Sequence, residues 1–199
     1  GSNILPASKV IDNVLEDLKQ AEQLLVKDPV ITEGPRNSAA SDGVNDLRLR
    51  TYRLNYYAVQ ALMARVYLYA GRNEDALSMA RKLVEIQSKW YPFADYNSLM
   101  ESGNKSKDRV FSTEVLFGLE NKKRGEIFTN YFTPELDNGI LAPTNTSLLN
   151  IFLTESTSDC RFTPFWIRPD NGKYSFRCFH KYEAPEESDP FFSYLVPMI

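Results

Sequence analysis

The chain has 199 residues, of which 43% are hydrophobic and 25% charged, with a formal net charge of -3 at pH 7. These values are typical of a soluble globular protein, and no stretch approaches the roughly 20 apolar residues of a membrane-spanning helix. The 23 basic residues are scattered along the chain, whereas a nucleic-acid-binding protein gathers them in a stripe.

The two ends suggest a piece of a longer protein. Gly1-Ser2 stand where an initiator Met would stand, and they resemble residues left after tag removal. Residues 194–199 (YLVPMI) form an apolar run without a polar tail. We therefore expect residues 1–199 to form part of a larger domain.

Residues 8–26 have the pattern of an amphipathic helix that Ser8 could cap with its hydroxyl group. Asp28-Pro29 would end this helix. Residues 32–46 are small and polar, which predicts a loop, and its length suggests a mobile or functional segment.

Residues 51–70 and 73–88 predict two helices joined by a very short turn. Gly71 stands where a left-handed glycine ends a helix, and Asn73 could cap the next one. The expected inner face of the second helix consists of Ala76, Leu77, Ala80, Leu83, Val84 and Ile86. The pair fits the spacing of a tetratricopeptide (TPR) repeat, with Ala64, Tyr67, Gly71, Ala76 and Ala80 at its small, aromatic and glycine positions.

The second half of the chain has a weaker helical signal. Residues 110–120 predict a buried strand, residues 122–145 an irregular stretch, and residues 147–152 a helical turn or two. Residues 165–168 and 173–176 flank Asn171-Gly172, which favours a tight hairpin. The predicted fold is mainly α, with TPR-like antiparallel helix pairs of the α-α superhelix type in residues 8–92. Residues 93–199 form a smaller irregular part that contains the β-hairpin.

The sequence offers no constellation for catalysis or for a metal or other cofactor. His180 is the single histidine, so a Ser-His-Asp triad would have to include it, and a structural role is expected instead. Cys160 and Cys178 form no CxxC pair, and they could be two unlinked thiols or one disulfide. Four carboxylates share the acidic stretch 183–190, which predicts a solvated loop, with weak Ca²⁺ binding as the less favoured alternative: Glu183, Glu186, Glu187 and Asp189. Asp159 and Arg161 are expected to form a local ion pair, although both could bind sugar hydroxyls.

Aromatic side chains carry the remaining hypothesis, because sugar rings stack on them while aromatic rings also fill cores. Tyr57 and Tyr67 are expected in the helical core, Phe111 and Phe117 in the buried strand, and Trp90 and Tyr91 against the helix that they end. Ligand contact is assigned to rings in the irregular stretch and the hairpin: Phe128, Tyr131, Phe132, Trp166 and Tyr174.

Four segments occur in an order that resembles the SusD/RagB-like proteins. Residues 54–68 (LNYYAVQALMARVYL) resemble the family's TPR helix, and residues 112–119 (STEVLFGL) resemble its S-x-E-V-I-F strand. Residues 159–162 (DCRF) resemble its D-x-R element, and Lys181-Tyr182 followed by residues 194–199 resemble the approach to its next TPR helix.

The resemblance implies a lipoprotein anchored on the outer membrane and exposed at the bacterial cell surface. Such proteins bind oligosaccharides or polysaccharides without catalysis and deliver them to a SusC-like TonB-dependent transporter. Their lipid anchor would lie outside residues 1–199. The alternatives are a TPR-type protein-interaction module without glycan binding and, less well supported by the carboxylate positions, a carbohydrate-active enzyme.

Overall fold

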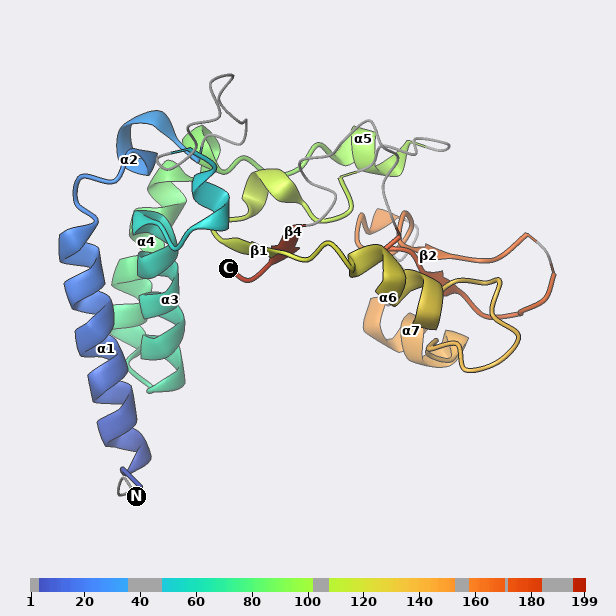
Figure 1. The fold of residues 1–199 in the computed structure, drawn as a ribbon, viewed down its shortest axis with the longest axis horizontal. Coiled ribbons are helices and arrows are strands. Elements are labelled where there is room, and N and C mark those ends of the chain that lie inside the picture. The colour runs from blue at the N-terminus through green and yellow to red at the C-terminus, as the bar shows by residue number, and fades with distance from the viewer. Residues whose placement is uncertain (1–3, 36–47, 102–107, 153–157, 171, 184–194) are drawn as a thin grey trace. The chain divides into compact units, whose positions relative to one another are not determined.

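The computed structural model describes residues 4–35, 48–101, 108–152, 158–170, 172–183 and 195–199 (Figure 1). These residues are mainly helical, with two short antiparallel sheets of two strands each, so the predicted fold class is confirmed. The chain divides into two compact units. Unit 1 contains residues 1–93, 113–119 and 197–199, and unit 2 contains residues 94–112 and 120–196. Most of the predicted loop 32–46 and of the acidic stretch 183–190 lies outside the described residues.

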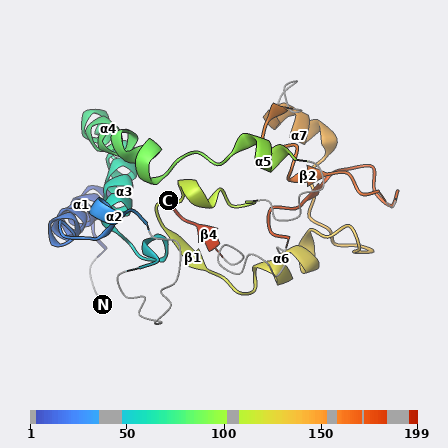
Figure 2. The same cartoon turned by 90° about the horizontal axis from the view of Figure 1, so that it is seen from above.

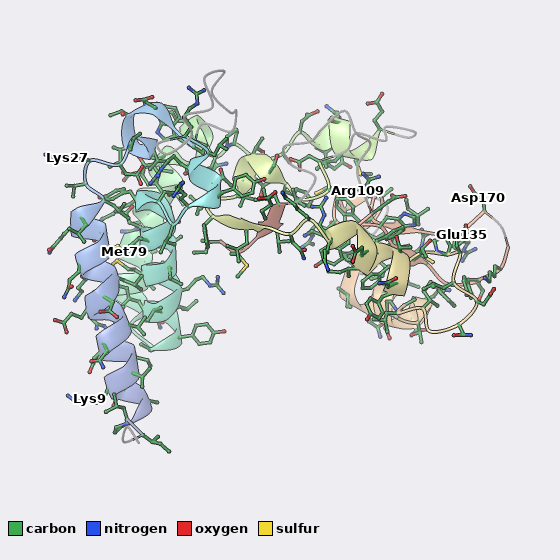
Figure 3. The ribbon with its side chains drawn as sticks, viewed as in Figure 1. Lys9, Lys27, Met79, Arg109, Glu135 and Asp170 are labelled. Carbon is green, nitrogen blue, oxygen red and sulfur yellow. The ribbon has the colours of Figure 1, made fainter. Side chains whose placement is uncertain are left out.

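Three helices form the body of unit 1: α1 (Ala7–Leu24), α3 (Tyr56–Tyr69) and α4 (Asn73–Trp90). Helix α3 packs on both α1 and α4, and Figure 2 shows the three helices nearly end-on with α3 between the others. Their shared core consists of Leu15, Leu18, Val59, Met63, Tyr67 and Ala76. Met79 extends from α4 against this core (Figure 3). Each fully buried leucine contributes about 2 kcal/mol to this packing.

The turn between α3 and α4 has the hydrogen bonds of a Schellman motif. Gly71 has a φ of 72°, its N–H donates to the Leu68 carbonyl at 3.0 Å, and the Arg72 N–H donates to the Tyr67 carbonyl at 2.9 Å. The predicted role of Gly71 is therefore confirmed. The predicted cap Asn73 is wrong, because this turn leaves Arg72 at the N-cap position and Asn73 inside the first turn of α4.

The starts of the other two long helices also differ from prediction. Helix α1 begins at Ala7 after Pro6, so Ser8 lies inside the helix and makes no capping bond. Residues Arg50–Tyr52 form a 3-10 turn, and α3 begins only at Tyr56. Asn55 caps α3, because its Oδ1 accepts a hydrogen bond from the Ala58 N–H at 3.0 Å.

A second apolar cluster joins the short helix α2 (Val30–Glu33) to α3 and α4. It centres on Val30, Tyr57 and Tyr91, and Trp90 packs against it, so the core roles predicted for these aromatic residues and for Tyr67 are confirmed. Leu77 and Val84 of α4 are instead exposed, at 51% and 73%. Their predicted place on the inner face is wrong, because α4 packs along a narrower stripe than its apolar residues cover.

Residues 108–120 are more irregular than the predicted buried strand. They contain the 3-10 turn η2 (Ser112–Glu114) and the strand β1 (Gly118–Glu120), which pairs with β4 (Leu195–Pro197). Phe111 has a φ of 55°, and the Asp108 Oδ2 accepts a hydrogen bond from the Ser112 N–H at 2.7 Å. This turn interrupts the strand, and Phe111 and Phe117 are half-buried.

The remaining elements are α5 (Tyr96–Met100), α6 (Arg124–Tyr131), α7 (Asn145–Phe152), β2 (Trp166–Ile167) and β3 (Cys178–Phe179). Helix α6 lies inside the stretch predicted to be irregular, and α7 confirms the helical turns predicted near residue 147. The hairpin is present, but residues 173–176 are not its second strand. β2 pairs with β3 in the register Trp166↔Phe179 and Ile167↔Cys178.

Candidate functional site

An aromatic cluster in unit 2 contains two of the five residues predicted to contact a ligand. It consists of Phe132, Trp166, Phe179 and Tyr182, all half-buried. The cross-strand partners Trp166 and Phe179 have ring centroids 4.6 Å apart. Phe132, just after α6, lies 5.8 Å from the Phe179 ring and 6.1 Å from the Tyr182 ring. Phe132 and Trp166 therefore belong to one cluster because both rings lie next to the Phe179 ring.

The other three predicted ligand residues have different surroundings. Phe128 is 9% exposed, and its ring centroid lies 5.2 Å from that of His180. Tyr131 is 49% exposed on α6. Tyr174 stacks on Phe176 at 4.6 Å, and its hydroxyl donates to the Leu136 carbonyl. Of the five, Tyr131 offers the most accessible ring for a sugar, and ligand contact at all five positions stays a prediction.

Next to Phe128, the side chains of His180 and Arg109 both contact Glu183. Its Oε2 lies 3.2 Å from the His180 Nδ1 and 3.1 Å from the Nη2 of Arg109, which is labelled in Figure 3. The hydrogen bond from His180 and the charge of Arg109 lower the pKa of Glu183 against the effect of burial. Burial, followed by the charge of Arg124, lowers the pKa of the neighbouring Lys181. These contacts hold the His180 ring in place, and its structural role stays a prediction.

A pocket of about 420 Å³ opens in unit 2 beside the hairpin. We call it the arginine pocket, and its lining consists of Asn145, Leu148, Leu149, Phe162, Thr163, Arg168 and Arg177. Helix α7 supplies the first three residues, and the two arginines flank the paired strands β2 and β3. The lining thus joins an apolar surface to an amide, a hydroxyl and two guanidinium groups.

Two hydrogen bonds fix the polar part of the arginine pocket. The Arg177 Nη1 donates to the Trp166 carbonyl at 2.8 Å, and the same guanidinium group lies 5.0 Å from the Phe162 ring centroid. The Asn145 Nδ2 donates to the Ser175 carbonyl at 3.1 Å. Arg168 is exposed. Sequence reasoning missed this pocket, because neither arginine belongs to a motif and only the strand register brings them together.

The Asp159–Arg161 pair forms as predicted, with the Arg161 Nη2 2.7 Å from the Asp159 Oδ2. The same Asp159 also accepts a hydrogen bond from the Arg161 N–H at 2.8 Å, which fixes the local backbone. The side-chain hydrogen bonds from Arg161, together with its backbone hydrogen bond and charge, lower the pKa of Asp159. Cys160 and Cys178 are free thiols, and burial raises the pKa of Cys178.

A shallower apolar groove of about 200 Å³ lies along the end of α4 in unit 1. Its lining is mostly apolar and includes Leu83, Val84, Ile86, Tyr91, Phe93 and Leu116, together with Gln87 and Glu114. Val84 and Phe93 are 73% and 76% exposed. We call it the α4 groove, and it presents apolar side chains at the surface of the TPR-like helix pair.

Comparison of the chain with known protein families, with curated proteins and with solved structures found no match. Within the described part of the chain, no three His, Cys, Asp or Glu side chains are grouped in a way that could hold a metal ion. The helices of that part include none with both the length and the apolar character needed to cross a membrane.

Proposed function

We propose that this protein captures oligosaccharide or polysaccharide at the bacterial cell surface without chemically changing it. In this proposal it is a SusD/RagB-like lipoprotein of the outer membrane that passes the glycan to a SusC-like TonB-dependent transporter. The arginine pocket is the main structural observation that supports the proposal. The family resemblance of the four sequence segments supports the cellular role.

The lining of the arginine pocket suits both the apolar C–H face and the hydroxyl groups of a sugar. Leu149 is 53% exposed and offers apolar surface to the C–H face of a ring, while the other apolar lining residues, Leu148 and Phe162, are buried. The Asn145 side chain uses its Nδ2 on Ser175, which leaves its Oδ1 to accept a hydrogen bond from a sugar hydroxyl. The volume of about 420 Å³ lies within the roughly 300–1,000 Å³ of small-molecule sites.

Tyr131 and the aromatic cluster offer a second kind of sugar contact. Rings stack on the C–H face of sugars, and Tyr131 has half of its surface available for this purpose. Trp166 links the cluster to the pocket, because its carbonyl accepts the hydrogen bond from Arg177.

The test is affinity electrophoresis of the purified protein in gels that contain plant or host polysaccharides. We expect at least one glycan to retard the protein, and we expect Tyr131→Ala or Trp166→Ala to reduce the retardation. Tyr69→Ala is the matched control, because Tyr69 is an exposed tyrosine on α3 in unit 1. No retardation across the panel, or equal loss in the control, would contradict glycan capture at this site. Release of reducing sugar would show an enzyme instead.

A second candidate function is protein binding by the TPR-like helices, and the α4 groove favours it. Exposed apolar residues beside a groove are typical of interaction sites. If the candidate transporter binds there, Val84→Asp should weaken its co-purification with the protein, whereas Glu85→Gln, on the exposed neighbouring residue, should not. Equal co-purification of both variants with the transporter would remove the α4 groove as its binding surface.

A further inference from the structure

We propose that the arginine pocket recognises the carboxylate of an acidic sugar, that is, of a uronic acid unit in the glycan. The inference rests on the proposed function and specifies its ligand class. It starts from the register of the hairpin. Trp166 pairs with Phe179 and Ile167 with Cys178, so the next positions outward along the two strands are Arg168 and Arg177.

Both residues line the arginine pocket just beyond the paired strands, so two like charges lie close together. Like charges at opposite positions of an antiparallel pair are destabilising. Two other arginines of unit 2 each have a carboxylate partner: Arg109 pairs with Glu183 at 3.1 Å and Arg161 with Asp159 at 2.7 Å. By contrast, no carboxylate among the described residues lines the arginine pocket or pairs with Arg168 or Arg177.

The guanidinium groups have the donors that a carboxylate needs. A guanidinium carries five N–H donors in a planar fork, and Arg177 commits its Nη1 to the Trp166 carbonyl. Its other donors, together with those of the exposed Arg168, can bind the two oxygens of one carboxylate with charge-assisted hydrogen bonds. A bound anion would therefore relieve the repulsion between the two arginines as well as gain hydrogen bonds.

The rest of the lining makes a sugar carboxylate a better fit than a small inorganic anion. The pocket of about 420 Å³ is far larger than such an ion and is walled by Leu148, Leu149 and Phe162. A uronic acid places its carboxylate at one edge of a ring whose C–H face can lie on the exposed side chain of Leu149. The Asn145 Oδ1 can then accept a hydrogen bond from a ring hydroxyl.

The experiment compares charged glycans with their neutral counterparts. The full chain is run by affinity electrophoresis in polygalacturonate, alginate and hyaluronan, each beside its methyl-esterified form, which has lost the negative charge. We expect the dissociation constant derived from the retardation to be at least tenfold lower for at least one uronate polymer than for its methyl ester. Arg168→Gln should weaken binding of that polymer about tenfold, the effect of one charge-assisted hydrogen bond.

Arg81→Gln is the charge-matched control, because Arg81 is exposed on α4 in unit 1 and the substitution changes the net charge equally. Circular dichroism checks that both variants are folded. Equal weakening in both variants, or equal binding of a polymer and its methyl ester, would overturn the inference. Binding of neutral glycans alone would overturn it and leave the proposed function standing. Binding of no glycan would overturn both.

Discussion

Arg50 and Asp28 form a buried ion pair in unit 1. The Arg50 Nη2 lies 2.6 Å from the Asp28 Oδ2, and their side chains are 9% and 0% exposed. Asp28 also accepts hydrogen bonds from the Val30 N–H at 3.0 Å and the Tyr56 N–H at 3.2 Å. One carboxylate therefore joins the first residues of α2 and α3 to the 3-10 turn at Arg50.

The first prediction concerns this ion pair. Arg50→Met leaves the Asp28 carboxylate buried without its cation, and we expect unit 1 to lose about 3 kcal/mol of unfolding free energy. Trp90 and Trp166 are the two tryptophans of the chain and belong to different units. In a Trp166→Phe background, urea unfolding followed by fluorescence therefore reports on unit 1.

The control for Arg50 is Arg72, whose Nε lies 2.8 Å from the Asp75 Oδ2 in an exposed pair. Arg72→Met should change the unfolding free energy by less than about 1 kcal/mol, because solvent screens exposed pairs. Similar losses for the two variants would mean that burial of the Asp28 carboxylate is not the source of the effect.

The second prediction concerns Asn55, which is fully buried at 0% exposure. Its Nδ2 donates to the Arg50 carbonyl at 2.9 Å and to the Leu116 carbonyl at 2.7 Å. Asn55→Asp keeps the cap of α3 but turns this donor into a carboxylate oxygen that faces two carbonyl oxygens. We expect the unfolding free energy of unit 1, measured by the same fluorescence assay, to fall by about 3 kcal/mol.

Asn73→Asp serves as its control, because Asn73 is an exposed residue in the first turn of α4. A negative charge there interacts favourably with the helix dipole, so we expect no loss and at most a small gain in stability. If Asn55→Asp is as stable as Asn73→Asp, the Asn55 amide does not hold the two carbonyl groups together.

The third prediction concerns the close approach of Gly34 to Trp90. Gly34 has a φ of 73°, and a Cβ at this position would lie 2.5 Å from the Trp90 Cε3. Gly34→Ala therefore adds a steric clash to an unfavourable backbone conformation, and we expect a loss of about 2–4 kcal/mol. Gly71 has a similar φ of 72° but nothing within 4 Å, so Gly71→Ala should cost only about 1 kcal/mol. Urea unfolding followed by circular dichroism compares the two, and equal losses would exclude the clash.

The helical half could be predicted because its signals are local. The apolar spacing of residues 54–68 and the glycine that ends α3 depend on neighbours within a few positions, and the Schellman bonds of Gly71 follow from them. Exposure was harder to predict. Val84 fits the apolar period of α4, but its burial depends on which helices pack there.

The candidate site could be predicted only in part. Phe132 and Trp166 were identified by residue type, yet their meeting through Phe179 depends on the pairing of β2 with β3. A hairpin with its turn at residues 171–172 would pair Trp166 with a residue other than Phe179. The opposition of Arg168 and Arg177 is lost in that register, so the arginine pocket could not be derived from the sequence.

The last prediction concerns acid stability and follows from Glu183. The hydrogen bond from His180 and the charge of Arg109 lower its pKa below the ordinary value of 4.5. Between the ordinary and the lowered pKa, the unfolded chain binds more protons at this carboxyl group than the folded chain does. The contribution of Glu183 to stability is therefore complete above about pH 4.5 and is lost as the pH falls through the folded pKa.

We expect Glu183→Gln to lower the stability of unit 2 at pH 7 and to flatten its decline below about pH 4.5. Trp166 fluorescence in a Trp90→Phe background measures urea unfolding of this unit at each pH. Glu126→Gln, on an exposed residue of α6, is the control and should keep the wild-type decline. Asp159 and Asp137 also have a lowered pKa and contribute to the decline at acid pH. The test therefore compares the dependence of the unfolding free energy on pH between Glu183→Gln and Glu126→Gln. Parallel pH curves for these two variants would mean that His180 and Arg109 do not stabilise the charged form of Glu183.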